Sequence, residues 1–173
     1  MSVFRSLSEE HALMRELGRR LRRSLDERDQ ERAPRETRNI LLVLLHALDG
    51  HERFEDRVFV RPLEGVEGGS RAAATMARQH AAIVRLRNET EALLQEGAAV
   101  DLRLLRPLAE RLVVMLERHF EEEERELWPQ LNAVVSRAER RRADLEAARR
   151  LEEMKKELAS YWTAVDEYLS SDS

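Results

Sequence analysis

Two segments of the chain place a histidine four residues before a glutamate, His51 with Glu55 and His119 with Glu123. In an α-helix this spacing puts both side chains on one face, one turn apart. An imidazole nitrogen and a carboxylate oxygen together suit iron, manganese or zinc. Each pair therefore predicts part of a metal site, provided that its segment is helical and the pair points inward.

Two further histidines, His11 and His80, lie in segments with a helical period of apolar residues. His11 falls on one stripe with Leu7 and Met14, and His80 follows Met76 at a step of four residues. Both histidines thus stand where the pattern requires a buried residue. The sequence predicts four inward histidines and two inward glutamates.

Inward glutamates need cations or strong hydrogen-bond donors, because an unpaired buried carboxylate is costly. Two carboxylates on opposite helices can bridge two metal ions, with two histidines completing each ion. Such a site leaves room for water, oxo or hydroxo groups, and for O₂, peroxide or NO. The predicted site has one iron on His11 and His51, the other on His80 and His119, and Glu55 and Glu123 as bridges.

The fifth histidine, His46, is not expected in this set. It lies five residues before His51, about 140° around the helix, which assigns it to the surface or to packing. The alternative interpretation makes the other histidines hydrogen-bonded core residues, because a single inward histidine is usually of that kind. Four of them in one bundle, two with a glutamate one turn further on, favour metal.

The residues must be positioned by helices, because the chain is rich in Ala, Leu, Glu and Arg and shows no strand pattern. Proline and glycine divide it into expected helices over about residues 6–30, 34–60, 71–96, 101–128 and 136–169. Ser6 and Ser136 each begin a capping box. The fold class is therefore all-α: an up-down-up-down antiparallel four-helix bundle over residues 1–132, with a C-terminal helical extension over 133–173 that packs on the bundle or a partner.

Helix lengths give a test of this arrangement. At about 1.5 Å per residue, His51, His80 and His119 each lie about 15 to 16 Å from helix ends that meet at one end of the bundle. These three histidines therefore share a layer. His11 lies only about 7 Å after Ser6, so it fits that layer less well unless its helix starts earlier.

Composition narrows the function further. The chain has 173 residues and no cysteine, which excludes metal sites built on thiolates. Its net charge of −4 argues against a general affinity for nucleic acid or anionic membranes. The first residues, MSVFRSLSEE, lack the apolar segment of a signal peptide, and the longest apolar run, Ile40 to Leu45, is too short to span a membrane. We expect a cytoplasmic protein.

The set of metal-ligating residues, in this order along about residues 6–132, resembles the hemerythrin-like, HHE cation-binding family. The resemblance also includes Pro62 after the first His-x-x-x-Glu pair and Trp128-Pro129 after the second. It implies an up-down four-helix bundle and a non-haem diiron site that reacts with O₂ or related small molecules.

The chain departs from the oxygen carriers of that family in two respects and has one feature of another branch. They have a second histidine in the third helix, where Met76 and Val84 stand here. They use a carboxylate five residues after the last histidine, so Glu124 competes with Glu123. Glu52 matches an extra ligand of the iron-sensing domain of a eukaryotic F-box protein. The four-histidine, two-glutamate set resembles that branch and bacterial hemerythrin-like proteins, which favours sensing, peroxide or NO chemistry, or iron storage.

Our first hypothesis is a diiron protein that binds or senses O₂, NO or peroxide. The alternatives are an enzyme that turns over peroxide, an iron store, and a structural or adaptor bundle with a vacant metal site. We favour binding or sensing over enzyme activity, because we identify no acid or base near the metal layer. The last helix, with Tyr161, Trp162, Val165 and Leu169, is the expected surface for a homodimer or a partner protein.

Overall fold

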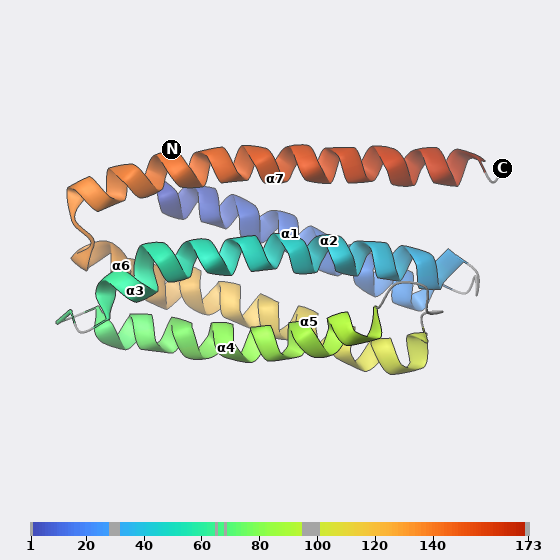
Figure 1. Cartoon of the computed structure of the whole chain (residues 1–173), viewed down its shortest axis with the longest axis horizontal. Coiled ribbons are helices and arrows are strands. Elements are labelled where there is room, and N and C mark those ends of the chain that lie inside the picture. The colour runs from blue at the N-terminus through green and yellow to red at the C-terminus, as the bar shows by residue number, and fades with distance from the viewer. Residues whose placement is uncertain (1, 28–31, 65, 68, 95–100, 172–173) are drawn as a thin grey trace.

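The computed structural model describes residues 2–27, 32–64, 66–67, 69–94 and 101–171, except the side chains of Trp162 and residues 164–171. Four long helices form the bundle: α1 (Val3–Asp26), α2 (Arg32–Glu55), α4 (Ser70–Leu93) and α5 (Leu102–Glu122). They alternate in direction, and α7 (Arg137–Ser171) lies along the outside of the bundle (Figure 1). The prediction of an all-α bundle with an additional long C-terminal helix is confirmed.

Two π-helical segments follow the His-x-x-x-Glu pairs. Segment η1 (Asp56–Val60) begins directly after α2, and η2 (Glu123–Leu127) directly after α5. The short helices α3 (Arg61–Leu63) and α6 (Trp128–Val134) come next, each with a proline in its first turn, where a missing N–H group costs little. Sequence periodicity predicted uninterrupted α-helix here and did not detect the π-helical turns, which often occur at functional sites.

Helix α1 begins earlier than the sequence suggested. Its N-cap is Ser2, whose hydroxyl accepts a hydrogen bond from the Arg5 backbone N–H at 3.3 Å. Ser6 is buried within the helix, so the predicted start and capping box at Ser6 are wrong. Because α1 starts at Val3, His11 lies about 12 Å from the helix start, closer to the expected layer.

The predicted capping box at the start of α7 is present. The Ser136 N–H donates to Glu139 Oε2 at 3.1 Å, and the Glu139 N–H donates to Ser136 Oγ at 3.3 Å. Pro107 lies within the second turn of α5. The predicted helix ends at Gln30 and Gly97 lie outside the described residues, as do the side chains of Trp162, Val165 and Leu169.

The buried core has two apolar parts with the predicted ligands between them. Along α1, Leu7 belongs to one part and Met14 to the other, with His11 between them. Along α4, Met76 and Ile83 are divided in the same way by His80. Each histidine is therefore held in place by apolar packing above and below it, because close-packed neighbours leave few alternative side-chain conformations.

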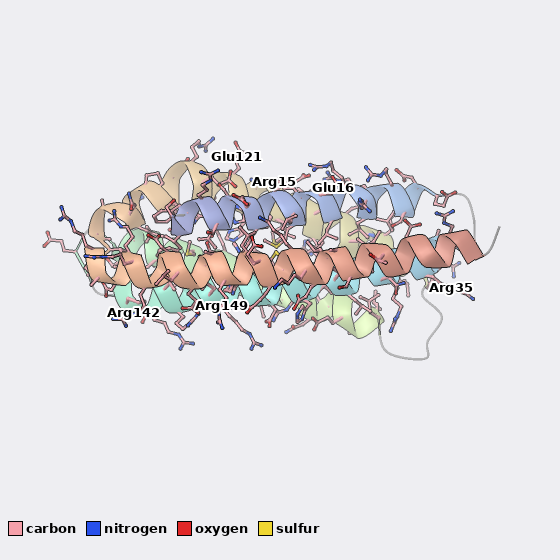
Figure 2. All side chains as sticks on the ribbon, turned by 90° about the horizontal axis from the view of Figure 1, so that it is seen from above. Arg15, Glu16, Arg35, Glu121, Arg142 and Arg149 are labelled. Atoms are coloured by element: carbon pink, nitrogen blue, oxygen red, sulfur yellow. The ribbon has the colours of Figure 1, made fainter. Side chains whose placement is uncertain are left out.

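Helix α7 packs on the bundle over much of its length. Ala147 joins one apolar part and Met154 the other. The Val3 N–H donates to Asp144 Oδ1 at 2.6 Å, and Lys155 Nζ lies 3.0 Å from a Glu9 carboxylate oxygen. Figure 2 shows α7 running across the face of the bundle.

Among the described residues, no helix combines the length and the apolar character that crossing a membrane requires.

Candidate metal centre

The structure brings all six predicted ligands together in the middle of the bundle. Each of them is buried, with at most 3% of the residue exposed. Their ligand atoms form two groups of four, within each of which all atoms lie inside 4.8 Å of one another. The first group is His11, His51, Glu55 and Glu123, and the second is Glu55, His80, His119 and Glu123. The two glutamates are shared, which is the arrangement that bridging carboxylates require.

Each group draws its histidines from two neighbouring antiparallel helices. His11 on α1 meets His51 on α2, and His80 on α4 meets His119 on α5. Glu55 is the last residue of α2, and the π-helical turn that follows separates it from the next helix. The helical repeat places each glutamate beside its own histidine, and the bundle places it beside the opposite pair.

In the first group, both histidines use Nδ1 to contact a carboxylate on another helix. His11 Nδ1 lies 2.8 Å from Glu124 Oε1, which also accepts a hydrogen bond from Arg15 at 3.0 Å. His51 Nδ1 lies 2.8 Å from Glu10 Oε2. Because a carboxylate only accepts, each Nδ1 carries the proton and donates. Both imidazoles are thereby fixed with Nε2 directed inward.

The second group repeats this pattern with one difference. His80 Nδ1 lies 2.8 Å from Asp56 Oδ1, whereas His119 Nδ1 lies 2.9 Å from the amide oxygen of Gln79. The Gln79 amide nitrogen donates to Glu122 Oε2 at 2.8 Å, which assigns the amide oxygen to the histidine. All four histidines therefore direct Nε2 toward the centre of the bundle.

The inward Nε2 atoms of His11 and His51 lie only 2.9 Å apart. With both Nδ1 atoms donating to carboxylates, neither neutral imidazole has an N–H left for this contact. Two lone pairs at that distance repel each other unless a cation, either a proton or a metal ion, lies between them. A proton or a metal ion shared by the two rings accounts for this contact. Burial disfavours the charged form of His51, but the nearby Glu55 and Glu10 outweigh burial and raise the pKa of His51, so protonation is favoured in the metal-free state.

Two carboxylates lie close to these inward nitrogens. The closest imidazole nitrogen to Glu123 Oε1 is His119 Nε2 at 3.2 Å, and Glu55 Oε2 lies 3.4 Å from His80 Nε2. None of these four atoms has a hydrogen-bond partner among the described residues. The remaining Glu55 oxygen accepts a bond from Trp128 Nε1 at 3.3 Å. Buried carboxylates and imidazoles without hydrogen-bond partners fit metal cations, which bind both kinds of group.

Protons compete for these positions in the metal-free state. Burial disfavours the charged form of His80, but its hydrogen bond to Asp56 and the nearby carboxylates outweigh burial and raise the pKa of His80 to about 12. Burial lowers the pKa of His119 to about 4. Burial also opposes ionisation of Glu55, yet the nearby His51 and His80 bring the pKa of Glu55 below its usual range. The centre therefore holds protons unevenly when it holds no metal.

The two carboxylates that the sequence left open lie outside both groups. Glu124 binds His11 Nδ1, so Glu123 is the residue that reaches the centre. Glu52 is buried and directed toward Arg87, at 3.6 Å from Nη1, and burial raises the pKa of Glu52 to about 8. His46 is exposed, as expected, and lies 3.8 Å from Glu157.

Sequence reasoning missed the residues that fix the imidazoles. Glu10 and Gln79 each directly precede a predicted ligand, and Asp56 directly follows one. Such neighbours in sequence point away from their own ligand's face, and each contacts a histidine of another helix instead. Their position beside the ligands in both halves of the chain is the signal that could have found them, because ligating histidines usually need an acceptor on the second nitrogen.

A comparison with protein families gives one match. The family described as the hemerythrin HHE cation binding domain matches residues 2–98 and, in a second placement, residues 71–172. The first placement includes His11, His51, Glu55 and His80, and the second includes His80, His119 and Glu123. No curated protein and no solved structure matches the chain.

Proposed function

The chain belongs to the hemerythrin HHE cation-binding family, and from this membership and the geometry of the centre we propose that it holds two non-haem iron ions, joined by an oxo or hydroxo group. One ion takes His11 and His51, and the other takes His80 and His119. Glu55 and Glu123 bridge them. The function is to bind or sense a small ligand: O₂, NO or peroxide.

One observation carries the proposal. The Nε2 atoms of His11 and His51 lie 2.9 Å apart, while the Nδ1 atom of each ring lies 2.8 Å from a carboxylate oxygen. A cation between these two rings would bind both nitrogens. Glu55 and Glu123 belong to both groups of ligand atoms, so they could bind a second cation beside the first. Iron is the expected metal because imidazole with carboxylate suits it and because the oxygen chemistry that the resemblance implies is iron chemistry.

The residues of the chain hold and orient, and bound iron would supply the affinity for the small ligand. Six protein ligands shared by two ions leave coordination positions for that ligand. Met76 and Val84 stand at the two positions where oxygen carriers of the family have a further histidine. The centre would thus have one protein ligand fewer than a carrier's, which favours sensing over reversible carriage.

Metal analysis with an optical spectrum tests the proposal. Protein expressed in iron-rich medium should contain about two irons per chain and absorb in the near ultraviolet through oxo-to-iron charge transfer. E123A should lose iron. E121A is the matched control, since Glu121 is exposed on the same acidic run (Figure 2). Wild-type protein without metal after such expression would overturn the proposal.

Ligand addition then separates binding from turnover. Azide, NO or peroxide should change the spectrum of the iron-loaded protein. A stable spectral change supports binding or sensing, whereas continuous consumption of peroxide identifies an enzyme instead.

A further inference from the structure

We propose that the two metal positions are inequivalent, and that the position on His11 and His51 binds its ion more tightly because Glu10 gives His51 a carboxylate partner where Gln79 gives His119 an amide. The inference rests on the proposed metal centre. It concerns the order in which the two positions fill.

The two halves of the centre correspond residue by residue. Glu10 directly precedes His11, as Gln79 directly precedes His80. Asp56 directly follows Glu55, as Glu124 directly follows Glu123. Each of these four acceptors contacts the Nδ1 of a histidine on another helix, at 2.8 or 2.9 Å. The distances match, so the halves differ in the chemical nature of one acceptor and not in its placement.

That difference changes the ligand. A carboxylate on Nδ1 makes the imidazole a more basic metal ligand than a neutral amide does, because it draws the Nδ1 proton toward itself. Loss of such an outer partner typically costs about 10- to 100-fold in metal affinity. The first position has two carboxylate partners, Glu10 and Glu124. The second has one, Asp56.

Helix α7 supplies an ion-pair partner to Glu10. The side chain of Glu10 is fully buried, where a carboxylate needs a cationic partner. Arg150 on α7 reaches it, with Nη2 at 3.3 Å from Oε2. The same guanidinium donates to the Gly50 carbonyl and lies over the Phe54 ring at 5.0 Å, so it is fixed from three sides. Helix α7 therefore contributes Arg150 to the surroundings of the first metal position, although the helix lies outside the four-helix bundle.

Gln79 has a corresponding support of a different kind. Its amide nitrogen donates to Glu122, which keeps the amide oxygen on His119. A glutamate at position 79 would face Glu122 as a like charge, and the wild-type amide avoids that repulsion. The asymmetry is consequently built into the neighbours of both acceptors.

Zinc titration followed by nuclear magnetic resonance tests the inference, because Zn²⁺ is diamagnetic and the imidazole signals report which histidines bind it. Wild-type protein with one equivalent of Zn²⁺ should show shifted Nε2 signals for His11 and His51, and His80 and His119 should shift with the second equivalent. E10Q should weaken Zn²⁺ binding at the first position by about 10- to 100-fold, which brings the affinities of the two positions closer together. The double variant E10Q/Q79E should reverse the order.

The outcomes separate the inference from the proposed function. If all four wild-type histidines shift together, or if E10Q/Q79E keeps the wild-type order, the inequivalence is wrong although metal binds. If no histidine shifts at two equivalents, the metal centre itself is wrong. Q79E alone should strengthen the second position, which keeps the test decisive if E10Q does not fold.

Discussion

His11 and His51 face each other through Nε2 atoms 2.9 Å apart, while their Nδ1 atoms contact Glu124 and Glu10. The outer hydrogen bonds set the tautomer, and the tautomer makes the inner contact repulsive unless a cation is present. Both rings are buried, and the Phe120 ring stacks on His11 with the ring centroids 3.9 Å apart.

Removing one inner histidine should remove iron, and removing the outer histidine should not. We expect H80A to hold at most about half of the wild-type iron, because the second group loses one of its two imidazoles. H46A should keep the wild-type content, since His46 is exposed and remote from both groups. Iron analysis of the two variants after identical expression is the measurement. Equal loss in both would show that the inward face is wrongly assigned.

Metal binding should release protons. The pKa of His80 is raised to about 12, so the metal-free protein carries this proton at neutral pH and a metal ion must displace it. Affinity should therefore rise with pH, by about tenfold per unit for each proton released. Calorimetric zinc titrations at pH 7.5 in two buffers of different ionisation enthalpy count the protons. A heat that does not depend on the buffer would contradict the expectation.

The same raised pKa fixes the sign for the stability of the metal-free protein. A histidine with a raised pKa stabilises the fold fully below its unfolded value, near 6.5, and this contribution is lost as pH rises toward about 12. The metal-free protein should thus unfold more easily at pH 9 than at pH 6.5. The H80A variant should show less of this loss, in thermal unfolding at both pH values.

Replacing Arg150 should change the metal affinity of one position, and replacing its neighbour Arg149 should change neither. R150A removes the guanidinium that lies 3.3 Å from Glu10 Oε2 and helps to hold this carboxylate on His51, so affinity at the His11 and His51 position should fall by up to about tenfold. R149A is the matched control, because Arg149 projects outward from α7 (Figure 2), with 71% of its side chain exposed. Stepwise Zn²⁺ titration measures both. A loss at the two positions alike in R150A would indicate a merely structural role.

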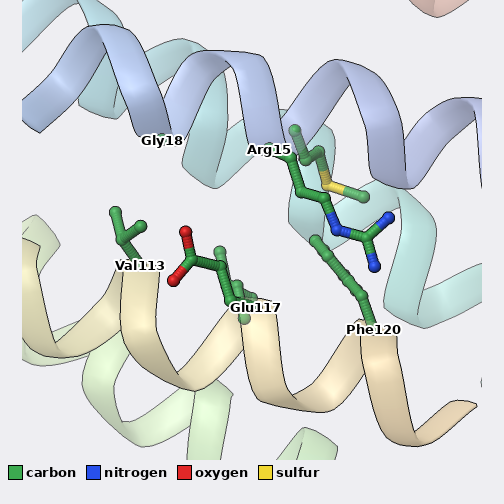
Figure 3. Close-up of a pocket in the computed structure, with 7 residues that line it drawn as sticks. Arg15, Gly18, Val113, Glu117 and Phe120 are labelled. Carbon is green, nitrogen blue, oxygen red and sulfur yellow. The ribbon is translucent and has the colours of Figure 1, made fainter.

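The space around two helical glycines predicts different effects of an alanine substitution, since Gly18 of α1 lies against α5 whereas Gly50 of α2 has more room. A Cβ on Gly18 would lie 3.1 Å from Val113 Cγ1, beside a cavity of about 10 Å³ that Phe120 also lines (Figure 3). A Cβ on Gly50 would meet its nearest atom, of Arg150, at an ordinary 3.7 Å. Urea unfolding should show G50A stabilised by roughly 0.5–1 kcal/mol and G18A neutral or destabilised by up to about 2 kcal/mol. The reverse order would contradict this.

The sequence predicted the six residues that cluster in the bundle, but not the residues that surround them. His51 with Glu55 and His119 with Glu123 follow from helical spacing alone, because both members of each pair lie on one face. The partner Asp56 was missed because it points away from that face and reaches His80 on a different helix. The π-helical turns were missed because apolar periodicity does not distinguish them from an α-helical turn.

Periodicity and spacing by themselves determined the helices and the inward face of each predicted ligand, because these properties repeat along a single helix. The antiparallel order of the helices followed from the predicted up-down-up-down bundle. Only the tertiary structure decided which residue fills the outer position of each imidazole and that α7 reaches Glu10 through Arg150. Those contacts join helices at particular rotations and heights. Helix rotation and height depend on how all the side chains pack together, which no single segment of the sequence encodes.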